Sequence, residues 1–267
     1  MPSFGLDEQE HEQLKTAGYL VRESIFDTAE TMQIASLCEQ VVQRVAHSKE
    51  NLYLDMGHYV FEIDKKLEVV IKWERENPEV LLGLEPVAHL SPDLRHWALD
   101  SRLTGPAADL IGHSEVCLYT EKLNLKKSRF GGPIVTHQDH PYWVDVADDV
   151  DKIATAVVFL DDASLANGCI EVLPGSHLGG LQKGKNTSGF GSNEMDTSDL
   201  DQSGFIPLEV PAGSAAFFGP RLVHRSLHNH SNQDRRAILF SYQPFGFRHS
   251  RHFVRLDKIP TDRKQSR

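Results

Sequence analysis

Two histidines and an aspartate have the types and spacing of a metal site. His137 and Asp139 are one residue apart and follow the extended segment 133–136. Side chains at i and i+2 of a strand lie on one side, so we expect this imidazole and carboxylate to reach a common point. His224, just after an apolar run, is the natural third ligand. Two histidines and one carboxylate on one face leave three positions open, as in the facial triad of non-haem Fe(II) oxygenases.

Arg235 is a second residue with chemistry to offer. It lies 11 residues after His224 and opens an apolar strand. A planar guanidinium there can bind a carboxylate through two parallel hydrogen bonds. Taken singly, these residues also have structural interpretations. His137 fits a hydrogen-bonded histidine at a strand end, and Arg235 fits a salt bridge at a strand edge.

The N-terminal third, which must support these residues, has the pattern of helices. Residues 7–18 start acidic and end at a glycine, and residues 28–46 carry apolar side chains at helical spacing. Thr28, Glu30 and Thr31 offer capping groups for the second helix. Residues 50–85 are mixed and charged, and their pattern supports no assignment.

After Gly112 the pattern changes to short strands separated by turns. The predicted strands are 115–125, 153–160, 169–173, 206–210, 214–218 and 236–243. The pair Asn167-Gly168 joins two of them and is the clearest hairpin signal. Helices followed by many short strands indicate an α+β fold, a double-stranded β-helix (jelly roll, cupin-like) buttressed by N-terminal helices. We expect a single domain over 1–267, with a helical part to about 112 and a jelly roll over about 113–250.

Residues 179–204 are rich in Gly, Ser, Asn and Asp and have almost no apolar periodicity. Loops of this length inside a compact domain are uncommon and often cover an active site. The segment is therefore interpreted as a lid, with a surface insertion as the alternative.

Composition excludes several classes of partner. The chain carries 28 basic and 38 acidic residues, a formal charge of −10, so neither nucleic acid nor an anionic membrane is expected to bind. No apolar run is long enough to span a bilayer, and neither end resembles a secretory or peroxisomal signal. Cys38, Cys117 and Cys169 suit free thiols in a reducing compartment rather than a zinc site. We expect a soluble cytoplasmic protein. The pattern does not predict an oligomeric state.

Several motifs in a fixed order resemble the phytanoyl-CoA dioxygenase superfamily of Fe(II)/2-oxoglutarate-dependent oxygenases. The resemblance covers most of the chain. The motifs are GYLV (18–21), HQDHPYW (137–143), VVFLDDASLANGCIEVLPGSH (157–177), PAGSAAFFGPRLVHRS (211–226) and RRAILFSYQ (235–243).

The resemblance implies a role for each matching residue. His137, Asp139 and His224 would bind iron. Arg235 would pair with the distal carboxylate of 2-oxoglutarate, with Arg236 as its rival on the opposite face of the strand. Ser226 and Asn124 would help to hold the cosubstrate, with a strand amide satisfied by the backbone as the alternative for Asn124. Trp143 matches an aromatic beside substrate or cosubstrate, with core packing as the alternative.

His177 is assigned to a structural turn, and His228 and His230 are assigned to a solvent-exposed loop.

The implied activity is a dioxygenase reaction that uses Fe(II), 2-oxoglutarate and O2, with ascorbate as an activator in vitro. It would hydroxylate an unactivated C–H of a small-molecule metabolite and release succinate and CO2. Desaturation, cyclisation and epimerisation stay open on the same scaffold. A metal-dependent isomerase or a binding module is the alternative from another class. The pattern does not identify the substrate.

Overall fold

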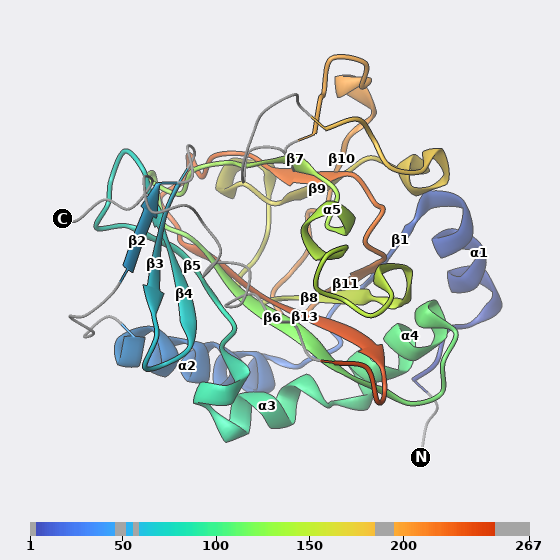
Figure 1. The fold of residues 1–267 in the computed structure, drawn as a ribbon, viewed down its shortest axis with the longest axis horizontal. Coiled ribbons are helices and arrows are strands. Elements are labelled where there is room, and N and C mark those ends of the chain that lie inside the picture. Colours follow the sequence, from blue (N-terminus) through green and yellow to red (C-terminus); the bar gives the residue numbers. More distant parts are fainter. Residues whose placement is uncertain (1–3, 46–51, 56–58, 185–194, 249–267) are drawn as a thin grey trace.

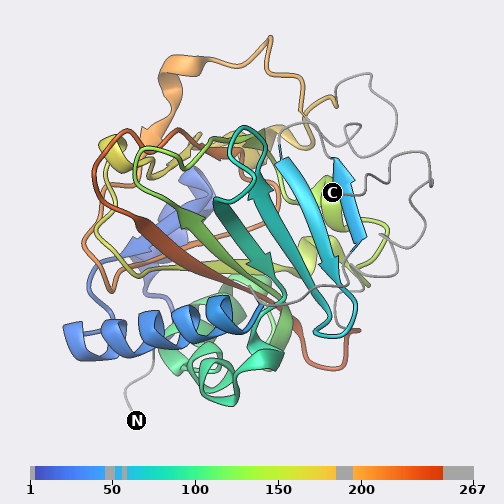
Figure 2. The same cartoon turned by 90° about the vertical axis from the view of Figure 1, so that its left-hand side faces the viewer.

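The computed structural model describes residues 4–45, 52–55, 59–184 and 195–248. Two antiparallel sheets face one another, and helices cover the outer side of the larger one (Figures 1 and 2). The predicted jelly-roll core with buttressing helices is confirmed. In the described residues, no helix is long and apolar enough to cross a membrane.

The large sheet has nine strands and the small sheet has four. In spatial order the large sheet contains β1 (Tyr19–Arg22), β11 (Ala215–Phe218), β8 (Ala154–Phe159), β13 (Arg235–Pro244), β6 (Val116–Lys126), β5 (Leu81–Glu85), β4 (Val69–Glu74), β3 (Tyr59–Asp64) and β2 (Leu52–Asp55). The small sheet contains β10 (Ile206–Pro207), β9 (Ile170–Val172), β12 (His224–Ser226) and β7 (Ile134–His137).

The α-helices lie mostly in the N-terminal part of the chain. They are α1 (Glu8–Ala17), α2 (Thr28–Val45), α3 (Pro92–Ala98), α4 (Ser101–Ile111) and the short α5 (His140–Trp143). Short 3₁₀ turns occur at Ala88–Leu90, Val150–Lys152, Leu165–Asn167, Ser176–Gly179 and Gln202–Gly204.

Two apolar cores hold these layers together. The larger core lies between the helices and the outer face of the large sheet, where Ile34 and Leu103 join Ile238 and Phe240. The smaller core lies between the two sheets, where Phe159 and Phe218 pack with residues of β9. Because successive strand residues point to opposite faces, alternate residues of β8, β11 and β13 serve one core or the other.

Residues 52–85 form four strands that extend the large sheet from β6. The expected helical part, to about residue 112, is therefore not wholly helical. In β3, both faces are buried: Phe61 and Ile63 point to one side, while Glu62 and Asp64 are buried on the other. A strand buried on both faces loses the simple alternation by which sequence patterns reveal strands.

The hairpin prediction at Asn167-Gly168 is wrong. The strand before it, β8, belongs to the large sheet, and the strand after it, β9, belongs to the small sheet. The chain crosses between the sheets through a 3₁₀ turn that ends at Gly168 with φ 72°. The Asn167 side chain stabilises this crossing, because its amide donates to Asp162 O and its oxygen accepts from Ser164 N.

The segment predicted as a lid is described only in part, since residues 185–194 lie outside the described ranges. A bridge between Gly184 and Met195 closes its base. Met195 and Phe205 are buried against Val223, the neighbour of His224. The described ends of the segment therefore pack beside the predicted metal ligands.

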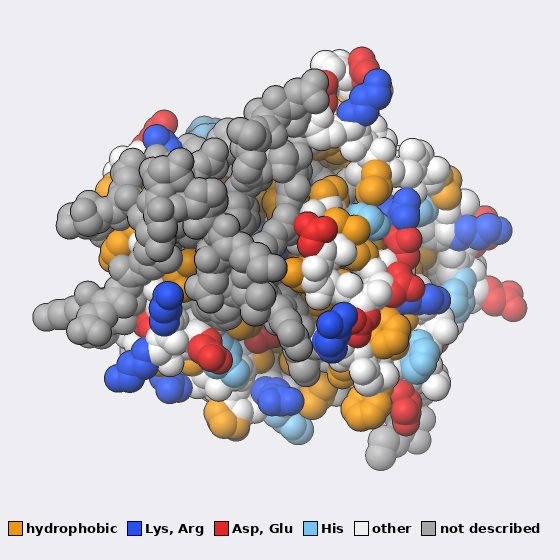
Figure 3. Space-filling view, viewed as in Figure 1, with side chains coloured by type: hydrophobic (Ala, Val, Ile, Leu, Met, Phe, Trp, Pro, Cys, Tyr) orange, Lys and Arg blue, Asp and Glu red, His pale blue; other side chains and the backbone are white. Residues whose placement is uncertain are grey.

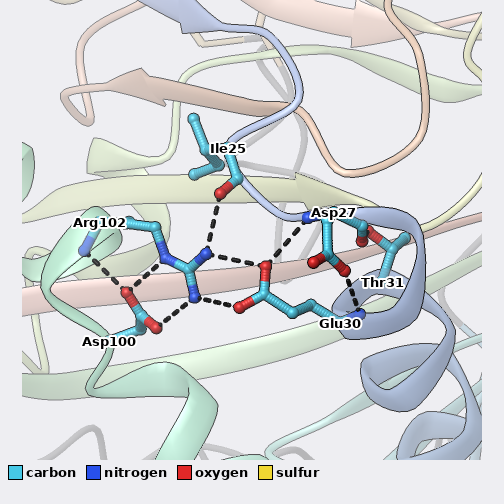
Figure 4. A network of polar contacts seen from close by, with 6 residues as sticks. All are labelled: Ile25, Asp27, Glu30, Thr31, Asp100 and Arg102. Carbon is cyan, nitrogen blue, oxygen red and sulfur yellow. Dashed lines mark hydrogen bonds and ion pairs between the residues drawn. The ribbon is translucent and has the colours of Figure 1, made fainter.

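An ionic network fastens α2 to α4 beneath the large sheet (Figure 4). The Arg102 guanidinium donates to both carboxylate oxygens of Glu30, to both of Asp100, and to the Ile25 carbonyl. Asp27, not Thr28, caps α2, because its carboxylate and that of Glu30 accept each other's backbone N–H. Hydrogen bonds from Arg102 lower the pKa of Glu30, and they outweigh burial to lower the pKa of Asp100.

Replacement of Arg102 by Ala should lower the free energy of unfolding by about 2–4 kcal/mol, since two partly buried carboxylates lose a charge-assisted partner. Lowered carboxyl pKa values stabilise the fold above their unfolded values, so this loss should shrink as pH falls below about 4. Chemical denaturation at pH 7 and pH 3 measures both effects. Arg95→Ala, at an exposed position of α3, is the control. An equal loss in the two variants would contradict the role of the network.

Candidate metal and 2-oxoglutarate site

Ligand atoms of His137, Asp139 and His224 lie within 4.8 Å of one another. His137 ends β7 and His224 begins β12, and the two residues are register partners across these strands. Their ring centroids are 4.2 Å apart, and Nε2 of His137 lies 3.7 Å from Oδ1 of Asp139. The residues that the sequence singled out as a facial triad thus converge on one point.

Backbone carbonyls orient both imidazoles. Nδ1 of His137 lies 2.8 Å from Val135 O, and Nδ1 of His224 lies 3.0 Å from Leu222 O. With the Nδ1 proton on a carbonyl, each ring presents the Nε2 lone pair to a metal. Burial and the neighbouring His224 lower the pKa of His137 to about 3, which favours its neutral, metal-binding form.

Asp139 reaches this point by a different route from the predicted one. Strand β7 ends at His137, and Asp139 has helical backbone angles at the start of α5. A turn from strand into helix, rather than alternation along a strand, brings the carboxylate to the imidazole. The Pro220 carbonyl, which accepts from His140 N–H, fixes the start of α5 against the loop before β12.

Arg235 is 1% exposed and makes no ion pair with a described residue. Its Nε is buried without a hydrogen-bond partner among the described residues, and so is the hydroxyl of Ser226. Burial lowers the pKa of Arg235 to about 10, so it stays charged at neutral pH. A buried cation and hydroxyl without partners fit a bound carboxylate, because such groups are costly to leave unsatisfied.

Arg236 has the opposite environment. Its guanidinium forms a two-pronged ion pair with Asp161, at 2.7 and 2.9 Å, on the other face of β13. The interpretation of Arg236 as the rival anchor therefore has no support in the geometry.

Asn124 lies on the same face of the large sheet as Arg235. It is the register partner of Ala237 on β13 and of Gly83 on β5. A Cβ at Gly83 would lie 3.3 Å from Asn124 Oδ1 and only 2.7 Å from Leu123 O. The absence of a side chain at Gly83 therefore leaves room for the Asn124 amide.

Trp143, on α5, is 1% exposed and packs edge-to-face against Tyr119. Its ring contributes to a small buried cluster with Val150 and Ile153. The core-packing interpretation of Trp143 thus has direct support. A contact with substrate stays a prediction.

His177, His228 and His230 are not part of the triad, as expected. His177 contacts the C-terminal end of α1, where its Nε2 lies 3.2 Å from Lys15 O. His228 and His230 are exposed and lie side by side in the loop after β12.

Gln138 is a residue whose importance the sequence pattern did not reveal. Its side chain is 2% exposed and points away from its neighbouring ligands. The amide donates to Gly180 O and Arg221 O at 3.0 and 2.6 Å, and its oxygen accepts from Gln182 N at 2.9 Å. Gln138 therefore ties the strand that carries His137 to the loop before His224 and to the start of the 179–204 segment.

Lys126 was also not anticipated. Its buried ammonium donates to the carbonyls of Gly132, Ser226 and Leu227, which connects β6 to the start of β7 and the end of β12. Burial and nearby Arg235 lower its pKa to about 7. The spacing of Lys122, Asn124 and Lys126 along one strand face was the available signal.

Comparisons with known proteins agree with this geometry. Residues 14–237 match the family model of phytanoyl-CoA dioxygenase (PhyH). A phytanoyl-CoA dioxygenase from Arabidopsis thaliana is 24% identical, over 82% of this chain and 82% of its own. A probable alpha-ketoglutarate-dependent hypophosphite dioxygenase from Stutzerimonas stutzeri is 29% identical, over 88% of this chain and 77% of its own.

The fold is also similar to a solved structure. The non-heme alpha-ketoglutarate-dependent carbocyclase SnoK from nogalamycin biosynthesis superposes with a TM-score of 0.70, at 17% identity, over 100% of this chain and 96% of its own. With the family model covering most of the sequence, the chain belongs to the phytanoyl-CoA dioxygenase family and is a 2-oxoglutarate-dependent dioxygenase.

Proposed function

We propose that His137, Asp139 and His224 hold Fe(II), and that the enzyme hydroxylates an unactivated C–H of a small molecule. The observation that carries the proposal is the convergence of these ligand atoms within 4.8 Å of one another in a fold with a buried, unpaired Arg235. When bound, Fe(II) and 2-oxoglutarate supply the oxidising chemistry, which consumes O2 and releases succinate and CO2.

The protein's own groups set the geometry of the reaction. The two imidazoles present Nε2 because their Nδ1 atoms are held by backbone carbonyls. Arg235 and Ser226 would bind the distal carboxylate of 2-oxoglutarate and fix its direction, with Asn124 beside it on the same sheet face. Burial around the triad excludes bulk water, which strengthens these electrostatic contacts.

The Asp139 carboxylate and the buried Arg235 favour some of the alternative reactions over others. A carboxylate ligand at Asp139 fills the position that a halogenase leaves open for chloride, so hydroxylation is preferred to halogenation. Cyclisation remains the second candidate, because a structure of the same fold is named a carbocyclase. An isomerase or binding module has no need for a buried, unpaired arginine. A small-molecule substrate, O2 as oxidant, ascorbate as activator and a cytoplasmic location remain predictions.

Replacing any one of the triad residues by Ala should abolish succinate release and weaken Fe(II) binding by about 10-fold or more. Metal content after gel filtration and succinate formation are the measurements. His228→Ala, an exposed histidine, serves as the control. Retained iron and turnover in one triad variant would remove that residue from the ligand set. Wild-type protein in excess chloride should form no chlorinated product.

Arg235→Ala should raise the apparent KM for 2-oxoglutarate by about 30-fold to several thousand-fold, since a buried pair then loses one partner. Arg235→Lys should be intermediate, because Lys restores the charge without the forked geometry. Arg236→Ala is the matched control, with iron binding intact in all three variants. If neither alanine variant changed the KM, the cosubstrate assignment would fail and the isomerase or binding-module alternative would lead.

Gln138→Ala should weaken Fe(II) retention by about 10-fold while the KM for 2-oxoglutarate changes little, because the side chain positions the ligand strands and not the cosubstrate. Metal affinity and steady-state kinetics separate the two effects. Gln33→Ala, on the exposed face of α2, is the control. A change in KM with unaltered metal affinity would rule out this positioning role.

A further inference from the structure

The inner face of the large sheet, which faces the small sheet, is divided into two halves. Over β8 and β11 it is apolar, where Val157, Phe159, Ala216 and Phe218 pack in the core between the sheets. Over β4, β5 and β6 it is polar. Lys72, Gly83 and Asn124 are successive register partners on these strands, and Lys122 and Glu85 lie two residues away on the same face.

Two lysines on this polar half share one carboxylate. Nζ of Lys72 lies 3.1 Å from Glu85 Oε2, and Nζ of Lys122 lies 3.6 Å from Glu85 Oε1. The Glu85 side chain is only 8% exposed, and the lysine side chains are 19% and 21% exposed. Both ammoniums are therefore largely removed from water, and among the described side chains they share the one carboxylate of Glu85.

The lysine pair lies toward the triad. Nζ of Lys122 is 5.6 Å from the ring centroid of Trp143, and the helix that carries Trp143 starts directly after Asp139. Burial opposes the charge of Lys122, yet Glu85 and Asp139 together raise its pKa. Burial lowers the pKa of Lys72 against the same two carboxylates. Asp139 thus attracts both ammoniums from its place in the triad.

The formal charges of the site can be summed for the state in which Fe(II) and 2-oxoglutarate are bound. Lys72, Lys122 and Glu85 sum to one positive charge. Fe(II) with Asp139 adds one more, and 2-oxoglutarate with Arg235 subtracts one. Lys126 and Glu74 offset each other nearby. Among the described side chains, the loaded site therefore retains about one positive charge, which a low-dielectric interior disfavours unless an anion balances it.

We propose that Lys122 and Lys72 form the substrate subsite, and that the substrate carries a singly charged anionic head group, a carboxylate or a phosphonate monoanion. This inference rests on the proposed function, because it places the anion beside the Fe(II)- and 2-oxoglutarate-binding residues. The head group would bind beside the two ammoniums, and the Trp143 ring, 5.6 Å from Nζ of Lys122, would flank the rest of the molecule.

A purely structural role explains the lysines less well. A Lys–Glu–Lys network that only joined β4, β5 and β6 would leave one positive charge unbalanced in the interior. A second buried ammonium adds a desolvation cost, and Asp139 cannot fully offset it once its carboxylate ligates metal. The positive charge left over from Lys72, Lys122 and Glu85 is explained if it binds an anionic ligand.

The test measures binding rather than turnover. Protein loaded with Fe(II) and saturating 2-oxoglutarate under nitrogen is titrated calorimetrically with hexanoate, hexylphosphonate and hexanamide, which share one tail. We expect at least one of the anions to bind about 10-fold or more tightly than the amide. Comparing hexanoate with hexylphosphonate identifies the head group.

Three variants make the test specific. Lys122→Met should weaken the anion by about 10-fold, whereas Glu85→Gln, which frees the ammoniums, should tighten it. Opposite signs cannot both arise from loss of folding. Lys66→Met, at an exposed turn of the same sheet, should change nothing.

The outcomes separate this inference from the function on which it rests. Equal affinity for anions and amide, or no binding of either anion, would overturn the subsite. A Lys122→Met variant that weakened 2-oxoglutarate instead would assign the lysine to the cosubstrate and likewise overturn it. Failure of the wild-type protein to bind 2-oxoglutarate would refute the proposed function itself.

Discussion

The pairing of His224 with His137 across β12 and β7 is the contact on which the site depends. β12 is only three residues long, and neighbouring groups hold it at both ends. At its start, Val223 N–H donates to Ser176 Oγ, while the Val223 carbonyl accepts from Leu173 N. After its end, Lys126 binds the Leu227 carbonyl. A strand this short cannot keep its register alone, so the turn at 174–177 and a buried lysine from the other sheet set the ligand spacing.

The division of the inner sheet face explains how one interior supports both stability and chemistry. Its apolar half supplies close packing between the sheets, which keeps the small sheet in place. The polar half, together with the adjacent start of β13, concentrates charges that an ordinary core would exclude, including Lys126 and Arg235 at 1% exposure each. Those charges are tolerated because backbone carbonyls, shared carboxylates and the proposed ligands complete them. On the large sheet, the proposed ligands would then lie over β4 to β6 and the adjacent start of β13, opposite the triad on the small sheet.

The sequence predicted the parts of the molecule in which a local pattern and the final environment agree. β6, β8, β11 and β13 are close to their predicted ranges, since each has an apolar run bounded by turns. Other features depend on tertiary contacts. Met32 has helical spacing with the buried side of α2 yet is 68% exposed, because the helix packs through Ile34, Cys38 and Val41. At Asn167-Gly168 the turn chemistry is real, but the connection joins different sheets, which a dipeptide does not encode.

The triad residues were identifiable because metal chemistry requires particular side chains, whereas the residues that support them were hidden. Lys122, Asn124 and Lys126 alternate along β6 in the way that normally marks a solvent-facing strand. Their true direction becomes apparent only when β5 and β4 extend the sheet and the small sheet covers it. Burial changes how these lysines are interpreted. An exposed lysine adds solubility, whereas a buried one is costly unless its ammonium has a partner. Alternating lysines opposite a metal-binding sheet are therefore better interpreted as buried groups that require a partner, backbone carbonyls for Lys126 and the proposed anion for Lys122, than as surface charge.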